Sequence, residues 1–112
     1  SAGTVVELGG VNEITMCQED SSNKVFGVIS FQPAYLMNAG QENGAPVAVA
    51  GRVPVRVLGR INKGDRLVSA GNGVARAASK EESINAFNVI GRAIQTKQTT
   101  GEGTVEAFVT IN

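Results

Sequence analysis

The chain lacks histidine and tryptophan, and aromatic residues make up only 4% of its 112 residues. Without histidine, the commonest general base and metal-binding side chain is missing, and neither a Ser-His nor a Cys-His catalytic pair exists. Cys17 is the only cysteine, which excludes an intrachain disulfide and a zinc site built from cysteines. We therefore expect no catalytic residue, no metal site and no cofactor, and we interpret Cys17 as a small core residue rather than a reactive thiol.

The chain also lacks an excess of charge of either sign, since 10 lysines and arginines balance 10 aspartates and glutamates. Binding to the phosphates of nucleic acid depends on an excess of positive charge, so we expect no nucleic-acid partner. No run of 18 apolar residues and no charged-then-apolar leader is present, which argues against membrane insertion and against a signal peptide. The length suits a single domain, residues 1–112, with one core.

The first residue, Ser1, leaves two interpretations open. The chain is either a protein whose initiator methionine was removed or a piece of something longer. In the second case Ser1 is a candidate for the residue exposed by an autoproteolytic cut.

What the chain has in abundance is glycine, with 14 residues, and alternating valines. The alternation is clearest after Gly51, where Val53, Val55 and Val57 are separated by residues of the opposite parity. A period of two is typical of a strand with one buried face and would place valines all around a helix. We expect residues 46–58 to form two strands that meet at Gly51, and Pro54 to mark an edge or a bulge.

Turn signals divide the rest of the chain into further short strands. Lys63-Gly64-Asp65 predicts a turn, and Gly71-Asn72-Gly73 is the strongest hairpin signal because Asn-Gly accepts positive φ at both turn positions. Gly27 and Gly91 lie within expected strands, where a bulge or a close backbone approach is expected. The expected strands cover residues 4–8, 11–17, 24–30, 65–70, 74–78, 88–96 and 104–111.

Two segments are expected to differ from this pattern. Residues 79–85 are the one candidate for a short helical turn. Residues 31–45 are interpreted as irregular, with a projecting tip at residues 38–44 and with Tyr35, Leu36 and Met37 plugging its base into the core. The predicted fold class is therefore all-β: a compact small barrel or β-clip-like domain of short strands with hairpins and at most one short helical turn.

Basic residues gather in the middle of the chain, where Asp65 is the only acid between residues 43 and 79. One interpretation is a solvated outer face of a sheet, and the other is a positive stripe that docks against an acidic neighbour such as another subunit. The interface candidates combine these cations with the base of the projecting loop: Arg52, Arg56, Arg60, Lys63, Arg66, Tyr35, Leu36 and Met37. Arg76 belongs to the same basic zone.

Four short motifs in this order resemble a known family. They are GVIS followed by Pro33, PVAVAGRVPVRV (residues 46–57), INKGDRL (residues 61–67) and VIGRA (residues 89–93). Together they resemble a β-rich module of tailed-bacteriophage virion proteins, found at the C-termini of tail-fibre and neck-appendage proteins. The similarity extends over nearly the whole chain, and GRVPV followed by KGDRL is its most specific part.

The resemblance implies a structural protein of the virion, part of a tail fibre or appendage, that acts by assembly and surface binding. A homotrimer is expected, because closed symmetry protects exposed strand edges. The other expected partners are further phage virion proteins and a host surface, which the loop at residues 32–44 would touch during host attachment.

Two alternatives remain open within the resemblance. The layout is also similar to that of phage head-decoration proteins, which implies a capsid decoration protein that stabilises the head. Some members of the first group are autoproteolytic intramolecular chaperones of the peptidase G2 type, which implies a single self-cleavage during fibre trimerisation. No catalytic residue of that family is placed on this chain.

Overall fold

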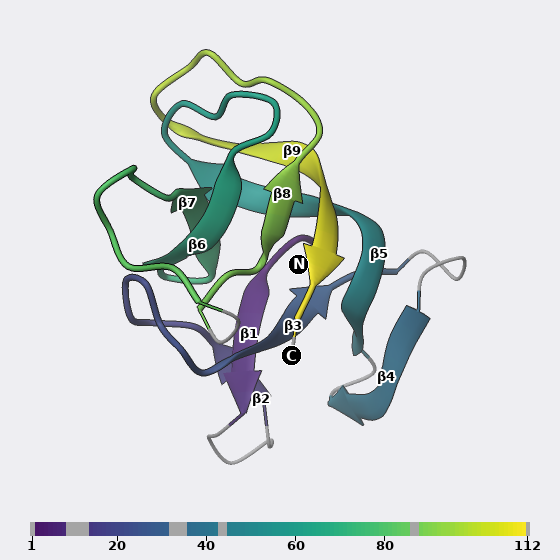
Figure 1. The fold of residues 1–112 in the computed structure, drawn as a ribbon. Helices are drawn as coiled ribbons and strands as arrows, with labels where there is room; N and C mark the ends of the chain where they lie inside the picture. The colour runs from purple at the N-terminus through teal and green to yellow at the C-terminus, as the bar shows by residue number, and fades with distance from the viewer. Residues whose placement is uncertain (1, 9–13, 32–35, 43–44, 86–87, 112) are drawn as a thin grey trace.

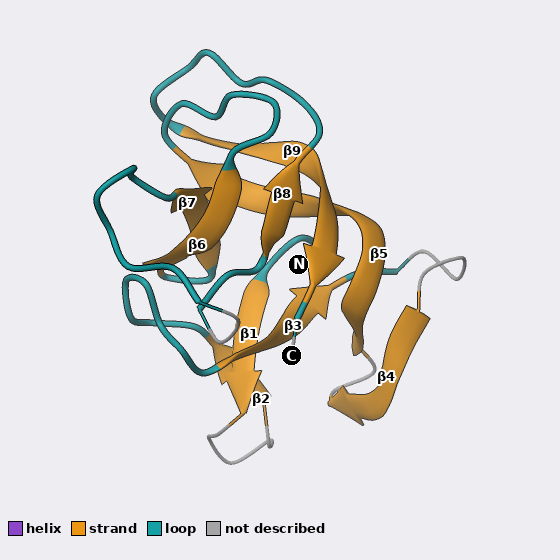
Figure 2. Ribbon diagram, viewed as in Figure 1, coloured by secondary structure: helices purple, strands orange, loops and turns teal. Residues whose placement is uncertain are grey.

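The computed structural model describes residues 2–8, 14–31, 36–42, 45–85 and 88–111, and within them it contains strands and loops but no helix (Figures 1 and 2). The strands in chain order are β1 (Val5–Leu8), β2 (Ile14–Met16), β3 (Val25–Ile29), β4 (Leu36–Glu42), β5 (Ala45–Leu58), β6 (Arg66–Gly71), β7 (Val74–Ala77), β8 (Gly91–Ala93) and β9 (Glu102–Thr110). The predicted all-β class is confirmed.

Five of the strands close into a small barrel. β5 pairs with β9 in an antiparallel ladder, β9 pairs with β8, β8 with β6, and β6 with β7. A parallel pairing of Val57 with Ala75 returns β7 to β5 and closes the ring. The predicted small barrel is therefore confirmed, and the Gly71-Asn72-Gly73 signal forms the β6–β7 hairpin with Asn72 at φ 55°.

The remaining strands extend the sheet away from the barrel, as Figure 1 shows at its lower end. Their order is β2-β1-β3-β5, and β4 pairs with the first half of β5. The N-terminal segment joins the two parts, because Gly3 N–H donates to Ile29 O and Arg56 N–H donates to Gly3 O. One core cluster consequently runs from Val28 in this extension to Val109 in the barrel.

The two faces of β5 follow its alternating sequence. Val53, Val55 and Val57 have 0% exposed surface, whereas Arg52 on the other face is exposed. At Pro54, β9 is the only partner strand of β5 among the described residues. The Arg56 N–H, two residues further along, points away from β9 toward Gly3 O, so the nitrogen of Pro54 also faces away from β9. No ladder hydrogen bond is lost there, which agrees with the predicted edge position.

β5 is one strand rather than the two that we expected. Gly51, at φ 108°, lies where its pairing with β3 and β4 gives way to the ladder with β9. A residue with a side chain rarely adopts this φ, so glycine allows the strand to bend from the sheet extension into the barrel without a break. The strand boundary that we expected at Gly51 is therefore the point where β5 changes its partner strand.

The structure corrects two further expectations. Residues 79–85 form a turn without a helix, in which the Glu82 N–H donates to Ser79 O at 3.4 Å and the Glu82 carboxylate accepts the Ser79 N–H at 2.8 Å and binds Arg76. The segment interpreted as a projecting loop contains β4, whose backbone pairs with β5 from Leu36↔Ala50 to Glu42↔Ala45. That pairing satisfies an edge of β5 that would otherwise lack partners, and it outweighs the low strand propensity of this polar segment.

Both mid-strand glycines are sites of close backbone approach, as predicted. A Cβ at Gly91 would lie 2.0 Å from the carbonyl oxygen of Phe108, and one at Gly27 would lie 2.2 Å from Val47 Cγ1. The register of β1 with β3 also shifts between Val6 and Glu7, beside Gly27. At Gly91 the obstacle is the backbone of β9, which cannot move without separating two strands of the barrel.

Adding one methyl group at Gly91 tests this approach. We expect Gly91→Ala to lower the free energy of unfolding by about 1–3 kcal/mol or more, the usual range for overpacking, measured by urea denaturation followed by circular dichroism. Gly101→Ala is the matched control, because a Cβ there meets no heavy atom within 4 Å. Equal stability of the two variants would contradict the close approach.

Candidate functional site

Arg52 and Arg56 lie on the outer face of β5, beside β9. Each reaches diagonally to a glutamate of β9: Arg52 Nε lies 3.1 Å from Glu106 Oε1, and Arg56 Nη2 lies 2.8 Å from Glu102 Oε1. Arg56 Nη1 also donates to Thr4 Oγ1 at 3.4 Å. The predicted positive stripe is therefore partly neutralised by β9, and Arg56 in particular has partners on two sides.

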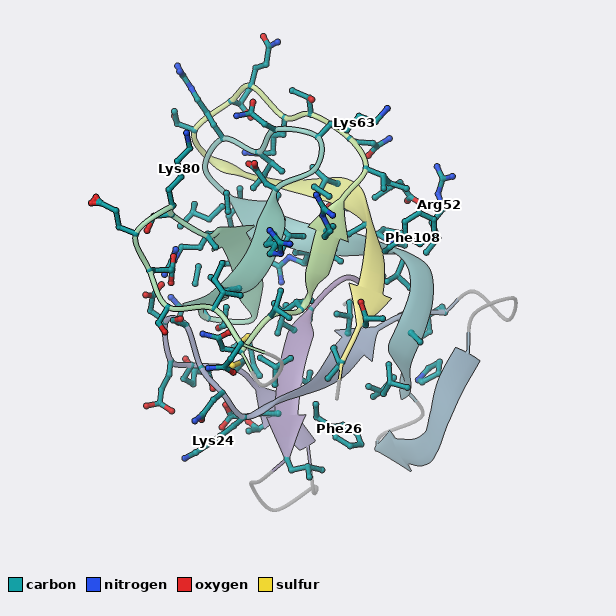
Figure 3. The ribbon with its side chains drawn as sticks, in the orientation of Figure 1. Lys24, Phe26, Arg52, Lys63, Lys80 and Phe108 are labelled. Atoms are coloured by element: carbon teal, nitrogen blue, oxygen red, sulfur yellow. The ribbon has the colours of Figure 1, made fainter. Side chains whose placement is uncertain are left out.

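Arg60 and Lys63 follow the end of β5 in the loop that leads to β6. Arg60 is exposed and lines a shallow hollow together with Asn62 and Lys97. Lys63 is exposed and its backbone N–H donates to Thr96 Oγ1 at 3.1 Å. In Figure 3 Lys63 lies near the barrel end of the molecule and Lys24 lies at the opposite end. Arg60 and Lys63 thus both lie on the outer surface of the barrel, but within the described residues they share no hydrogen-bond partner.

Arg66 belongs to a row of side chains that crosses four strands. Arg66 of β6 lies opposite Arg92 of β8, Arg92 lies opposite Phe108 of β9, and Phe108 lies opposite Arg52 of β5. Directly opposed residues point to the same side of a sheet. We call this set the arginine row: Arg66, Arg92, Phe108 and Arg52.

The arginine row faces solvent on the outside of the barrel. Phe108 is 55% exposed, and Figure 3 places it on the same side of the barrel as Arg52. Arg92 Nε donates to the carbonyl oxygen of Gly64 at 3.2 Å, which fixes the guanidinium while its two Nη groups have no recorded partner within the described residues. The row thus combines an exposed aromatic ring with cations on both sides.

The sequence prediction included Arg52 and Arg66 but missed Arg92 and Phe108. Arg92 alternates with the buried Gly91 and Ala93, so its outward position could have been read from the period of two. The same period assigns Phe108 to the outer face of β9. No local signal shows, however, that β6, β8, β9 and β5 are neighbours in this register.

Arg76, the remaining member of the basic zone, is held by two carboxylates. Its Nε and Nη2 lie 2.7 and 2.9 Å from the oxygens of Asp20, and its Nη1 and Nη2 lie 2.6 and 3.0 Å from those of Glu82. Such two-pronged pairs are strong and geometrically specific. Arg76 therefore ties the distant loop at Asp20 to the nearby turn at Glu82, and its donors are occupied by these two carboxylates.

The hydrogen bonds from Arg76 also set the protonation of its partners. They lower the pKa of Glu82 to about 2, with a further contribution from the Ser79 N–H, and they lower the pKa of Asp20. The same bonds raise the pKa of Arg76. All three groups are therefore charged at neutral pH.

Cys17 and the residues at the base of the predicted loop are the remaining positions singled out from the sequence. Cys17 is fully buried, and burial raises the pKa of its thiol, as expected for a core residue. Leu36 and Met37 pair through their backbones with Ala50 and Ala48, but their side chains, like Tyr35, lie outside the described residues. The interface role expected for Tyr35, Leu36 and Met37 therefore stays a prediction.

The described residues contain no group of three or more side chains that could hold a metal ion and no helix long and apolar enough to cross a membrane. No model of a protein family, no curated protein and no solved structure matches the chain.

The cluster of Arg76, Asp20 and Glu82 generates a pH prediction. Because the pKa of folded Glu82 is about 2, below its ordinary value of 4.5, its stabilising effect is present above pH 4.5 and is lost as the pH falls toward 2. We expect Glu82→Gln to lower the free energy of unfolding at pH 7 by about 1–3 kcal/mol, the scale of hydrogen bonds to charged groups. Urea denaturation at pH 7, 4 and 2.5 should show this loss shrinking at each step.

The matched control is Glu81→Gln, since the neighbouring Glu81 is exposed and makes no recorded ion pair in the described part of the chain. This control should change the stability little at any pH. A loss in Glu82→Gln that is equally large at pH 7 and pH 2.5 would contradict the electrostatic account.

Proposed function

We propose that this chain is a structural module of a tailed-bacteriophage virion, part of a tail fibre or appendage, and that it acts by assembly and surface binding. The proposal rests on the motifs that resemble such modules and on the way in which those motifs are used in the fold. It places the module in the virion, as a homotrimer whose outer surfaces contact other virion proteins or the host surface.

The observation that supports the proposal best is that three of the four resembling motifs supply strands of the barrel, while GVIS lies at the end of β3 in the sheet extension. PVAVAGRVPVRV (residues 46–57) lies in β5, the Lys63-Gly64-Asp65 turn leads into β6, and VIGRA (residues 89–93) includes β8. The buried valines of these motifs fill the core, and their polar residues face outward. The shared pattern is thus one that specifies the barrel and leaves its outer face available for contacts.

A second support comes from large apolar side chains that the isolated chain leaves in contact with water. Phe108 and Leu58 lie on the outer face of the barrel, and Leu8 and Met16 share one face of the β1–β2 hairpin. Leu8 is 61% exposed. Covering such residues on assembly is favourable, at roughly 25 cal/mol for each Å² of apolar surface removed from water. Contacts at two separate parts of the surface suit a module that bridges neighbours.

The capsid decoration alternative makes use of the same surfaces and differs in location. The order of a turn at Gly64-Asp65, the β6–β7 hairpin, β8 and a closing β9 is shared with that layout as well. Particle fractions therefore distinguish the two: a tail-fibre or appendage module remains with purified tails, whereas a decoration protein remains with heads.

The assembly state and the location generate one prediction. Light scattering after size exclusion should give the mass of three copies of the 11.6 kDa chain, and mass spectrometry should find the chain in gradient-purified particles of the phage whose genome encodes it, in the tail fraction. A monomer at high concentration would contradict the trimer, and absence of the chain from the particles would contradict the virion proposal.

A further inference from the structure

We propose that the arginine row (Arg66, Arg92, Phe108 and Arg52) is a docking site for an acidic polypeptide segment that carries an apolar side chain between two carboxylates. This inference rests on the proposed function, because it gives the chemistry of one partner that the assembling module would bind. The occupant is a strand-like stretch of a neighbouring protein.

The pairing of Arg66 with Arg92 is unfavourable in the isolated chain. The two residues lie directly opposite each other on adjacent strands, both are exposed, and the described residues include no ion-pair partner for either. Like charges in this position destabilise a sheet. Asp65, next to Arg66 in sequence, is occupied in the turn, where its Oδ2 accepts the Asn62 N–H at 2.8 Å. A bound carboxylate would relieve the repulsion.

The other end of the row also retains free donors. Arg52 uses Nε for its bond to Glu106, and its side chain is 57% exposed, so that both Nη groups remain available for a second carboxylate. Between the two cationic ends lies Phe108, which faces solvent although it is large and apolar. The row therefore offers positive charge, an apolar ring and positive charge in sequence, which is complementary to acid, apolar and acid.

The dimensions of the row fit an extended peptide. Adjacent strands lie about 4.8 Å apart, so the three steps β6-β8-β9-β5 cover about 14 Å along the convex outside of the barrel. An extended chain advances about 3.4 Å per residue, so side chains four residues apart on one face are also about 14 Å apart. A segment of the pattern acid-x-apolar-x-acid that follows this curved surface consequently matches the length of the row, with its central side chain near Phe108.

Carboxylates fit the surroundings better than phosphates do. The arginine fork matches both kinds of anion, but binding of a nucleic-acid backbone needs an excess of positive charge around the site. Glu106 lies within the row as the partner of Arg52, and the chain as a whole has a formal net charge of zero. Two discrete carboxylates need only the local charge that Arg66, Arg92 and Arg52 provide.

The test uses a fluorescein-labelled peptide, Gly-Glu-Ser-Leu-Ser-Glu-Gly, and its Glu-to-Gln counterpart, with binding to the full chain followed by fluorescence anisotropy at 50 and 150 mM salt. We expect saturable binding of the acidic peptide, at least tenfold weaker binding of the neutral one, and weaker binding at the higher salt concentration. Arg66→Gln combined with Arg92→Gln should weaken binding at least tenfold, and Phe108→Ser should weaken it severalfold.

The matched control is Arg60→Gln, which removes an exposed arginine outside the row and should leave the affinity within twofold. Arg66→Gln alone removes the repulsion and keeps the hydrogen bond from Arg92 to Gly64. This single variant should unfold at a urea concentration no lower than that of the unchanged chain and should still weaken binding, so the loss cannot be assigned to loss of folding. Equal binding of the two peptides, or equal weakening by Arg60→Gln, would overturn the proposal. Tighter binding of a ten-nucleotide oligothymidine would overturn it in favour of nucleic acid.

Failure here is distinguishable from failure of the proposed function. A trimeric chain found in virions that does not bind the acidic peptide would contradict only the docking site. A chain that binds the peptide through the row but is absent from virions would contradict only the virion proposal.

Discussion

The antiparallel ladder between β5 and β9 is the constraint on which the rest of the structure depends. It runs from Ala50↔Thr110 to Leu58↔Glu102 and is the longest pairing in the described chain. On its inner side the valines of β5 meet Val105, Ala107 and Val109 of β9, and these residues form much of the core. On its outer side the same register places each arginine of β5 diagonally from a glutamate. Gly51 then lets β5 continue into the sheet extension, so one strand organises both parts of the molecule.

The outer surface follows from that register without further assumptions. A slip by one residue would turn every side chain of β9 to the other face, bringing Phe108 into the core and Ala107 out of it. Gly91 supports the register from the other side, because it lets β8 approach the backbone of β9 at Phe108. The arginine row is thus a product of three pairings that are each fixed by the core. Its exposed cations and ring are held on rigid strands, which reduces the ordering that a partner would have to impose.

Local sequence patterns predicted those parts of the fold that depend on near neighbours in the chain. The alternation around Val55 gave the faces of β5, and Gly71-Asn72-Gly73 gave the β6–β7 hairpin, because both depend on a few adjacent residues. Arg76 could not be read correctly, since one of its partners, Asp20, lies 56 positions away in sequence. The meeting of Arg92 with Phe108 was missed for the same reason. The pairing of β4 with β5 joins near neighbours in the chain, and it was missed because the polar sequence of β4 has a low strand propensity.

We propose that the register fixed by the core presents one contiguous binding row on the outside of the barrel. Two-dimensional ¹⁵N–¹H NMR of the chain, titrated with a short acidic peptide, tests this claim most directly because it locates weak binding residue by residue. The account predicts the largest chemical-shift changes at the amides of Arg66, Arg92, Phe108 and Arg52, which lie side by side across β6, β8, β9 and β5. Largest changes at the β1–β2 hairpin or around Lys24, or no changes at all, would contradict it.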